Sequence, residues 1–190
     1  MKLSVTLTGT HPMLMHNGRL ANPIDPWTRQ LKALTSKRKK TDEDILQIAQ
    51  VEARAGCWET VDGMLGVPSA AVWRCFYDAS KQFKLGTTVK KSFYFDDVVE
   101  PLTVAGSQIS ATDFVADFDN VDYRTIKVQT SRVMRARPKV PVGWQTTHHF
   151  ELFDDVLDKR DLVNVMDSAG RLYGLGDWRP TYGRFTVEVV

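Results

Sequence analysis

Cysteine is scarce in this chain of 190 residues, and long apolar runs are missing from it. The two cysteines, Cys57 and Cys75, form no CxxC pair and have no spacing typical of a zinc site. Two isolated cysteines are typical of free thiols in a reducing compartment. No apolar run approaches the roughly 20 residues that a membrane-spanning helix needs, and the alternating N-terminus is unlike a signal peptide. The sequence therefore predicts a soluble cytoplasmic protein without a membrane partner.

The signatures of common catalytic sites are also missing. The sequence has no Walker motif, nucleophile elbow, HExxH motif or recognisable pair of carboxylates. His148 and His149 are adjacent, and neighbouring residues of a strand point to opposite faces, so the two cannot easily share a metal ion. We therefore expect no catalytic residue, no metal and no cofactor. One enzymatic alternative stays open, a metal-independent endoribonuclease that uses His16, beside Asn17 and Arg19, as general acid or base.

Positive charge is concentrated in two segments, although the net charge of the chain is only +2. Residues 27–40 and residues 124–139 each contain six Lys or Arg residues and no acidic residue. The rest of the chain is therefore net acidic, and this segregation indicates a site for a polyanion rather than a generally basic protein. For the run at 37–40, an ordinary solvated turn is the alternative. The candidate nucleic-acid contacts in these segments are Lys37, Arg38, Lys39, Lys40, Arg132, Arg135, Arg137 and Lys139.

The second basic segment alternates as a strand does. Between residues 126 and 140 one face is largely apolar, whereas the other is polar and ends in three aligned cations. A solvent-facing strand usually mixes charges of both signs, and no acid inside the segment compensates for these cations. We expect Gly143 to turn the chain, so that residues 144–153 form the partner strand of a protruding basic β-hairpin.

Hydrophobic periodicity predicts the other elements. Residues 2–9 alternate as a half-buried strand. Asp25-Pro26 is a typical helix start, and Thr41 with acids after it is another. The expected helices lie at 25–34, 41–56, 70–83 and 158–172, and further strands at 89–95 and 185–190.

This order of elements predicts a single α+β domain over residues 1–190. It is the order of a ferredoxin-like (RRM-like) antiparallel sheet, with a helical insertion after the first strand at about 24–56 and an irregular insertion at about 96–123. Helices would cover one face of the sheet. The open face of such a sheet is a common nucleic-acid platform.

Residues 174–185 form a glycine-punctuated segment between the last expected helix and the last strand. Glycine lets the backbone approach a ligand closely, arginine forks fit phosphates, and Trp and Tyr rings accept stacked bases. The alternative is a helix cap at Gly174 followed by a turn into an edge strand. The candidate contacts in this segment are Trp178, Arg179, Tyr182 and Arg184.

A ferredoxin-like frame whose last helix runs into a glycine-rich loop and a terminal Gly-Arg-Phe strand resembles the RAMP superfamily, the RNA-binding subunits of CRISPR effector complexes. The plan of residues 2–56 is also similar to that family. In addition, the chain resembles small tailed-phage proteins in the strings at 14–18, 36–42 and 174–180. The residues that carry the RAMP resemblance are Gly174, Gly176, Arg179, Gly183, Arg184 and Phe185.

The RAMP resemblance implies a loop that lies along a nucleic-acid backbone, and subunits that form a homo-oligomer or filament on the strand. A CRISPR-like or phage replication partner, and the host cytoplasm for a phage-encoded protein, are further implications. Together with the charge pattern, this predicts a non-enzymatic, sequence-tolerant protein that binds single-stranded RNA or single-stranded DNA. The alternatives are the endoribonuclease named above and a phage assembly or host-interaction protein whose basic patches meet an acidic partner.

Overall fold

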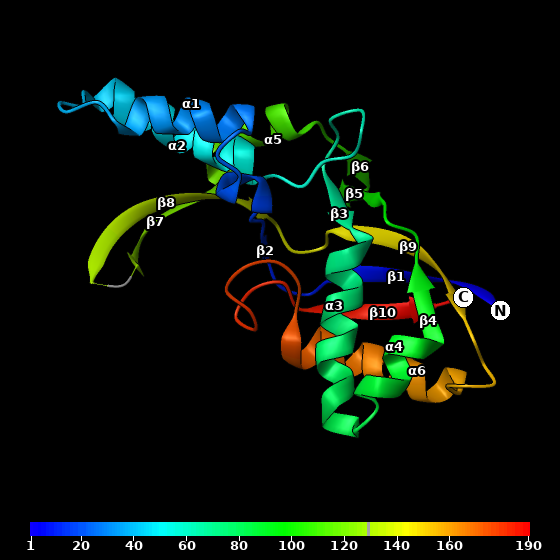
Figure 1. Cartoon of the computed structure of the whole chain (residues 1–190). Helices are drawn as coiled ribbons and strands as arrows, with labels where there is room; N and C mark the ends of the chain where they lie inside the picture. The colour runs from blue at the N-terminus through cyan, green and yellow to red at the C-terminus, as the bar shows by residue number, and fades with distance from the viewer. Residues whose placement is uncertain (129) are drawn as a thin grey trace.

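The computed structural model describes residues 1–128 and 130–190 and shows a mixed α+β protein with antiparallel sheets (Figure 1). The expected α+β class is therefore confirmed. The main sheet has the order β10-β1-β9-β5-β3, while β4 pairs with β9 and β6 pairs with β5. Its strands are β1 (Lys2–Gly9), β3 (Gly66–Pro68), β4 (Phe93–Phe95), β5 (Val99–Val104), β6 (Ser107–Gln108), β9 (Gln145–Leu152) and β10 (Phe185–Val189).

One face of the main sheet is apolar because the strands alternate with period two. In β1, Val5 and Leu7 are fully buried, whereas Ser4, Thr6 and Thr8 are partly exposed. Val5 lies opposite His148 of β9, and Leu7 lies opposite Thr146. Both partners in β9 are buried as well, so this register gives the two strands a common buried face, and its apolar residues join one core.

Helices cover this face of the sheet and complete the core. They are α3 (Ser69–Ser80), α4 (Gly86–Ser92) and α6 (Lys159–Ser168), with the short helices η2 (Lys81–Phe83) and η4 (Ala169–Tyr173) at the ends of α3 and α6. Phe76 of α3 is the centre of an aromatic cluster and lies 6.3 to 6.4 Å, ring centroid to centroid, from Phe93, Phe95 and Phe185. Truncating such a buried aromatic typically costs about 3–5 kcal/mol.

A second group of elements projects from the main sheet toward one side (left in Figure 1). It contains α1 (Pro26–Thr35), α2 (Asp42–Gly56) and the hairpin of β7 (Val121–Val128) and β8 (Ser131–Val140), which pairs further with β2 (Met13–Leu14). We call α1, α2 and the β7–β8 hairpin the arm. Around its base lie η1 (Gly18–Ala21), α5 (Ala111–Ala116) and η3 (Phe118–Asn120).

The two arm helices begin where the sequence predicts. Asp25 caps α1, accepting hydrogen bonds from the amides of Trp27 and Thr28, and Pro26 is the first helical residue. Thr41 and Asp44 form a capping box at the start of α2. Such caps satisfy backbone amides that have no partner inside the helix, and each contributes about 1 kcal/mol.

The predicted partner of the basic strand is wrong. Residues 131–138 pair with β7, and residues 145–151 pair with β1 in the other sheet. The segment 126–140 is not one strand, because β7 ends at Val128 and β8 begins at Ser131. The predicted alternation is also wrong, since Met134 is exposed and Ala136, Arg137 and Pro138 are buried in succession. Alternation determines which side chains share a face and does not determine the neighbouring strand. The strand predicted at 89–95 is shorter in the structure, where only β4 (Phe93–Phe95) is extended. Val89 belongs to α4, and its amide donates to the carbonyl of Leu85 at the start of this helix.

A buried histidine makes stability depend on pH. His148 is fully buried; its ring nitrogens lie 2.9 Å from the hydroxyl of Ser69 and 3.1 Å from that of Thr146. Burial lowers the pKa of His148 to about 4 from its ordinary 6.5, and the charge of His149 acts in the same direction. Between these values the unfolded chain binds a proton that the folded protein does not bind.

We therefore expect the free energy of unfolding to fall as the pH drops from 6.5 toward 4, by at most about 1.4 kcal/mol per pH unit. Chemical denaturation between pH 7 and 5 measures this slope. His148→Gln should flatten it, whereas His149→Gln, a change on the exposed face of the same strand, should largely preserve it. An equal slope in both variants would show that His148 is not the group responsible.

Candidate nucleic-acid interface

Like charges face each other across the β7–β8 hairpin. Lys127 lies opposite Arg132, and Arg124 lies opposite Arg135. Like charges directly opposite in a sheet are destabilising. Lys127 and Arg132 are exposed, and neither forms an ion pair within residues 1–128 and 130–190. The exposed half of the hairpin therefore presents positive charge that the protein itself leaves uncompensated.

Glu52 neutralises one of the predicted contacts. This residue of α2 is only 5% exposed. Its carboxylate accepts a 2.6 Å bond from Nη1 of Arg135 and a 3.0 Å bond from the buried amide of Ala136. The expectation that no acid compensates for the cations of this strand is thus wrong for Arg135. The compensating acid lies more than 80 residues away in sequence, so the local pattern could not reveal it.

Arg137 is also compensated, and it is shielded. It is 6% exposed, and its Nε lies 2.7 Å from a carboxylate oxygen of Asp177 in the C-terminal loop. The contact has the distance of an ion pair without the angles of a hydrogen bond, and Nη1 has no hydrogen-bond partner in the described part of the chain. The prediction of Arg137 as an exposed contact is therefore wrong, because its guanidinium is enclosed by protein. Lys139, next along the strand, is half-buried opposite Leu14.

The run at 37–40 forms the turn between α1 and α2, at the end of the helical arm. Lys37 pairs with Asp44 at 2.6 Å, and the hydrogen bond from Lys37 is the main cause that lowers the pKa of this carboxyl. The ammonium of Lys40 donates to the carbonyl of Lys37. Arg38 and Lys39 are exposed and have no ion pair among the residues that the structure describes. This turn is a second basic projection beside the hairpin.

The glycines of the C-terminal loop serve close packing. Gly176 has φ +79°, and a Cβ there would lie 2.2 Å from the carbonyl oxygen of Leu14. The amide of Asp177 donates to the same carbonyl at 2.8 Å. At Gly183, with φ +74°, a Cβ would lie 1.8 Å from the carbonyl oxygen of Leu175. The glycine pattern is thus explained by contacts of the loop with β2 and with itself.

The aromatic residues of this loop contact arginines of the hairpin. Trp178 is 38% exposed, and the guanidinium carbons of Arg124 and Arg137 lie 4.7 and 5.2 Å from its ring centroid. Nη2 of Arg124 donates to the hydroxyl of Tyr182 at 2.8 Å. A base that stacks on Trp178 would therefore share this ring with guanidinium groups. Trp178 also has φ +54°, an unusual backbone conformation for a residue other than glycine.

The two other cations of the loop, Arg179 and Arg184, differ in exposure, and Arg184 is half-buried. Nε of Arg184 donates to the carbonyl of Pro180 within the loop. Arg179 is exposed. The structure thus brings Trp178 and Tyr182 of the loop against the hairpin, where Trp178 meets Arg137. The turn at 37–40 lies elsewhere on the arm.

The open face of the main sheet has few cations. Cross-strand pairs on it include Thr6 with Thr147, whose hydroxyls lie 2.9 Å apart, and Lys2 with Glu151. Glu188 of β10 lies opposite Thr6 on the same face. Hydroxyl groups and carboxylates do not attract phosphates as a basic surface does. The expectation that this face is the nucleic-acid platform is therefore not favoured by its side chains.

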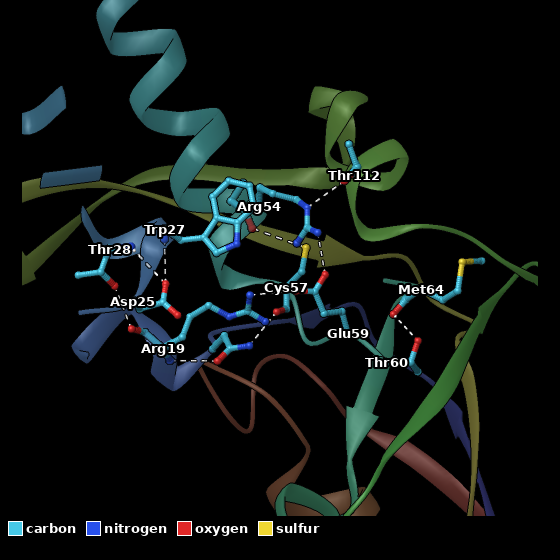
Figure 2. A network of polar contacts seen from close by, with 12 residues as sticks. Arg19, Asp25, Trp27, Thr28, Arg54, Cys57, Glu59, Thr60, Met64 and Thr112 are labelled. Atoms are coloured by element: carbon cyan, nitrogen blue, oxygen red, sulfur yellow. Dashed lines mark hydrogen bonds and ion pairs between the residues drawn. The ribbon is translucent and has the colours of Figure 1, made fainter. Parts of the chain in front are cut away.

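A polar network holds the base of the arm together (Figure 2). Glu59 accepts a 2.9 Å bond from Arg19 and a 2.7 Å bond from Arg54, whose guanidinium carbon lies 5.1 Å from the ring centroid of Trp27. Burial alone would raise the pKa of Glu59, but the hydrogen bonds and charges of the two arginines outweigh it and lower the pKa. The side-chain amide of Asn17 donates to the carbonyl of Cys57 at 2.9 Å.

This network gives Asn17 and Arg19 structural roles, although the sequence placed both beside a candidate catalytic histidine. His16 itself is exposed. It lines a groove of about 400 Å³ together with Arg135, Arg137 and Asp177, between the arm and the C-terminal loop.

The cysteines offer no reactive group. Both are buried, and burial raises the pKa of each thiol to about 12, so the thiols stay protonated. Among the described residues, no group of three or more His, Cys, Asp or Glu side chains is arranged to hold a metal ion.

The comparisons with known proteins give no family. No protein-family model matches the chain, and a search of curated proteins finds no significant match. In the part of the chain that the structure describes, no helix is long and apolar enough to span a membrane.

Removing Asp177 would leave the buried Arg137 without its carboxylate. We expect Asp177→Ala to lower the free energy of unfolding by about 3–5 kcal/mol, the usual cost of an uncompensated buried charge. Asp78→Ala is the matched control, because its partners Arg74 and Lys81 are solvent-exposed and such pairs contribute about 1 kcal/mol or less. Denaturation of both variants measures the difference. Equal small losses would contradict a structural role for the contact between Arg137 and Asp177.

Proposed function

We propose that this protein binds single-stranded nucleic acid, RNA or DNA, through the exposed cations of its arm. One observation carries the proposal: Lys127 and Arg132 face each other at the exposed part of the hairpin without an acidic partner in the described structure. Phosphates would relieve the repulsion between these cations and release condensed counterions. The turn between α1 and α2, which carries the exposed Arg38 and Lys39, lies on the same side of the molecule as the hairpin (Figure 1).

Sequence tolerance follows from the chemistry of these contacts. Lysine and arginine on phosphate oxygens fix the position of a strand but carry no base information. The partly exposed ring of Trp178 and the nearby Tyr182 offer stacking faces, which favour a strand whose bases are unpaired.

The strand order supports a ferredoxin-like frame as part of the proposal. β10, β1 and β9 are neighbours, and β4 and β5 both pair with the far edge of β9. In chain order, α3 lies between β1 and β4, and α6 lies between β9 and β10. These positions support the proposed β-α-β-β-α-β frame with insertions. The resemblance to RAMP proteins, the assembly of copies along a strand and a CRISPR-like or phage partner all stay predictions. A phage assembly or host-interaction protein is the alternative in which the same cations meet an acidic protein.

Salt dependence tests the binding mechanism. Four to six phosphate contacts on a single strand should give a slope of about −3 to −4 in log K against log salt. Fluorescence anisotropy with labelled oligo-U and oligo-dT at several salt concentrations measures it. Lys127→Gln/Arg132→Gln should bind more weakly and make the slope shallower by about 1.4, two contacts' worth.

Lys159→Gln/Arg160→Gln is the matched control, since it removes two exposed cations at the start of α6, outside the arm. It should bind as the unchanged protein does. A slope near zero, or equal losses in the two double variants, would contradict electrostatic binding by the hairpin.

The position of His16 in the groove with Arg135 favours endoribonuclease activity as a second candidate function. An imidazole can move a proton during RNA cleavage. If this activity exists, RNA is cut in the presence of a chelator, and His16→Ala abolishes the cutting while binding persists. RNA that stays intact over long incubation with the unchanged protein would exclude it.

A further inference from the structure

A second cluster of cations lies on α3 and α4, outside both basic segments of the sequence. The ring of Tyr77 has three cations close to it: Lys81 at 4.6 Å, Lys90 at 4.9 Å and Arg74 at 5.7 Å from the ring centroid. Trp73, one helical turn earlier, stacks on Tyr77 with centroids 5.3 Å apart and an interplanar angle of 6°. We call these five residues the α3 patch.

The charge of the α3 patch is only partly balanced. Asp78 pairs with Arg74 at 3.0 Å and with Lys81 at 2.8 Å. Burial would raise the pKa of Asp78, but its hydrogen bonds to these two cations lower it overall. One carboxylate thus pairs with two of the three cations around this ring, and Lys90 has no ion pair among the residues that the structure describes. A bound anion would reduce the repulsion between these cations, as it would at the hairpin.

A groove connects the α3 patch to the C-terminal loop. It has a volume of about 650 Å³ and is lined by Asp78 and Lys81 on one side and by Trp178, Arg179 and Pro180 on the other. Trp178 contacts Arg124 of the hairpin. Basic and aromatic side chains therefore continue from the hairpin, across the loop, to α3.

We infer that the α3 patch is a second contact surface for the same single strand, with phosphates on Lys81 and Lys90 and an unpaired base against the aromatic pair of Trp73 and Tyr77. This rests on the proposed function. The flat aromatic pair and the groove that leads to it favour a strand over an acidic peptide, because stacking on aromatic side chains suits any base. The sequence gives little sign of this patch. Trp73, Tyr77 and Lys81 are four residues apart and share one face of a helix, but they do not form a continuous basic segment.

Oligonucleotides of increasing length test this inference by anisotropy on the full chain. Lys81→Gln/Lys90→Gln should bind short oligonucleotides as the unchanged protein does. For oligonucleotides long enough to reach α3 it should bind more weakly, with a salt slope shallower by about 1.4. Lys159→Gln/Arg160→Gln is again the matched control and should show neither change. Both side chains of the first pair are exposed, so the melting temperature should stay the same.

The outcomes separate this inference from the proposed function. If the unchanged protein binds no strand at low salt, the proposed function fails, and the inference fails with it. If the unchanged protein binds but Lys81→Gln/Lys90→Gln shows the same length dependence and slope, only the inference is overturned. A polyglutamate peptide is the second probe. If Lys81→Gln/Lys90→Gln loses binding of this peptide but binds oligonucleotides as the unchanged protein does, the inference is overturned and the α3 patch is assigned to an acidic protein.

Discussion

The buried carboxylate of Glu52 is the contact on which the arrangement of the arm depends. It joins α2 to β8 by accepting bonds from the side chain of Arg135 and from the backbone of Ala136. The buried carboxylate and the buried amide would each be costly to leave without a partner, so these bonds hold α2 in place against the hairpin. Two basic projections, the turn after α1 and the exposed part of the hairpin, are thereby held on one side of the molecule.

Clustered positive charge in this protein has two uses. Arg135 and Arg137 form ion pairs within the protein: the partly exposed Arg135 pairs with Glu52 of α2, and the buried Arg137 pairs with Asp177 of the C-terminal loop. Lys127 and Arg132, nearer the turn of the same hairpin, are left exposed. The positively charged surface that is open to a ligand is therefore smaller than the number of Lys and Arg residues in 124–139 suggests. It lies on the arm and not on the polar open face of the main sheet. The proposed binding mode accordingly differs from stacking on a sheet face.

Local signals in the sequence were sufficient for much of the fold. The caps at Asp25 and Thr41 mark the starts of both arm helices, and the alternation of residues 2–9 identifies which face of β1 is buried. The candidate site was harder to predict from the sequence, because the contacts that neutralise its cations join residues far apart in the chain. Nothing near Arg137 indicates that Asp177 neutralises it, and the loop glycines serve contact with β2 as readily as they would serve a ligand.

Lysine footprinting measures most directly which surface meets the strand. The protein would be acetylated with and without a saturating oligonucleotide, and the modified lysines identified by mass spectrometry. The account predicts protection of Lys39 and Lys127 on the arm, while Lys2 on the open face of the main sheet and Lys159 on α6 stay reactive; all four are exposed in the free protein. Protection of Lys2 without protection of Lys127 would contradict it.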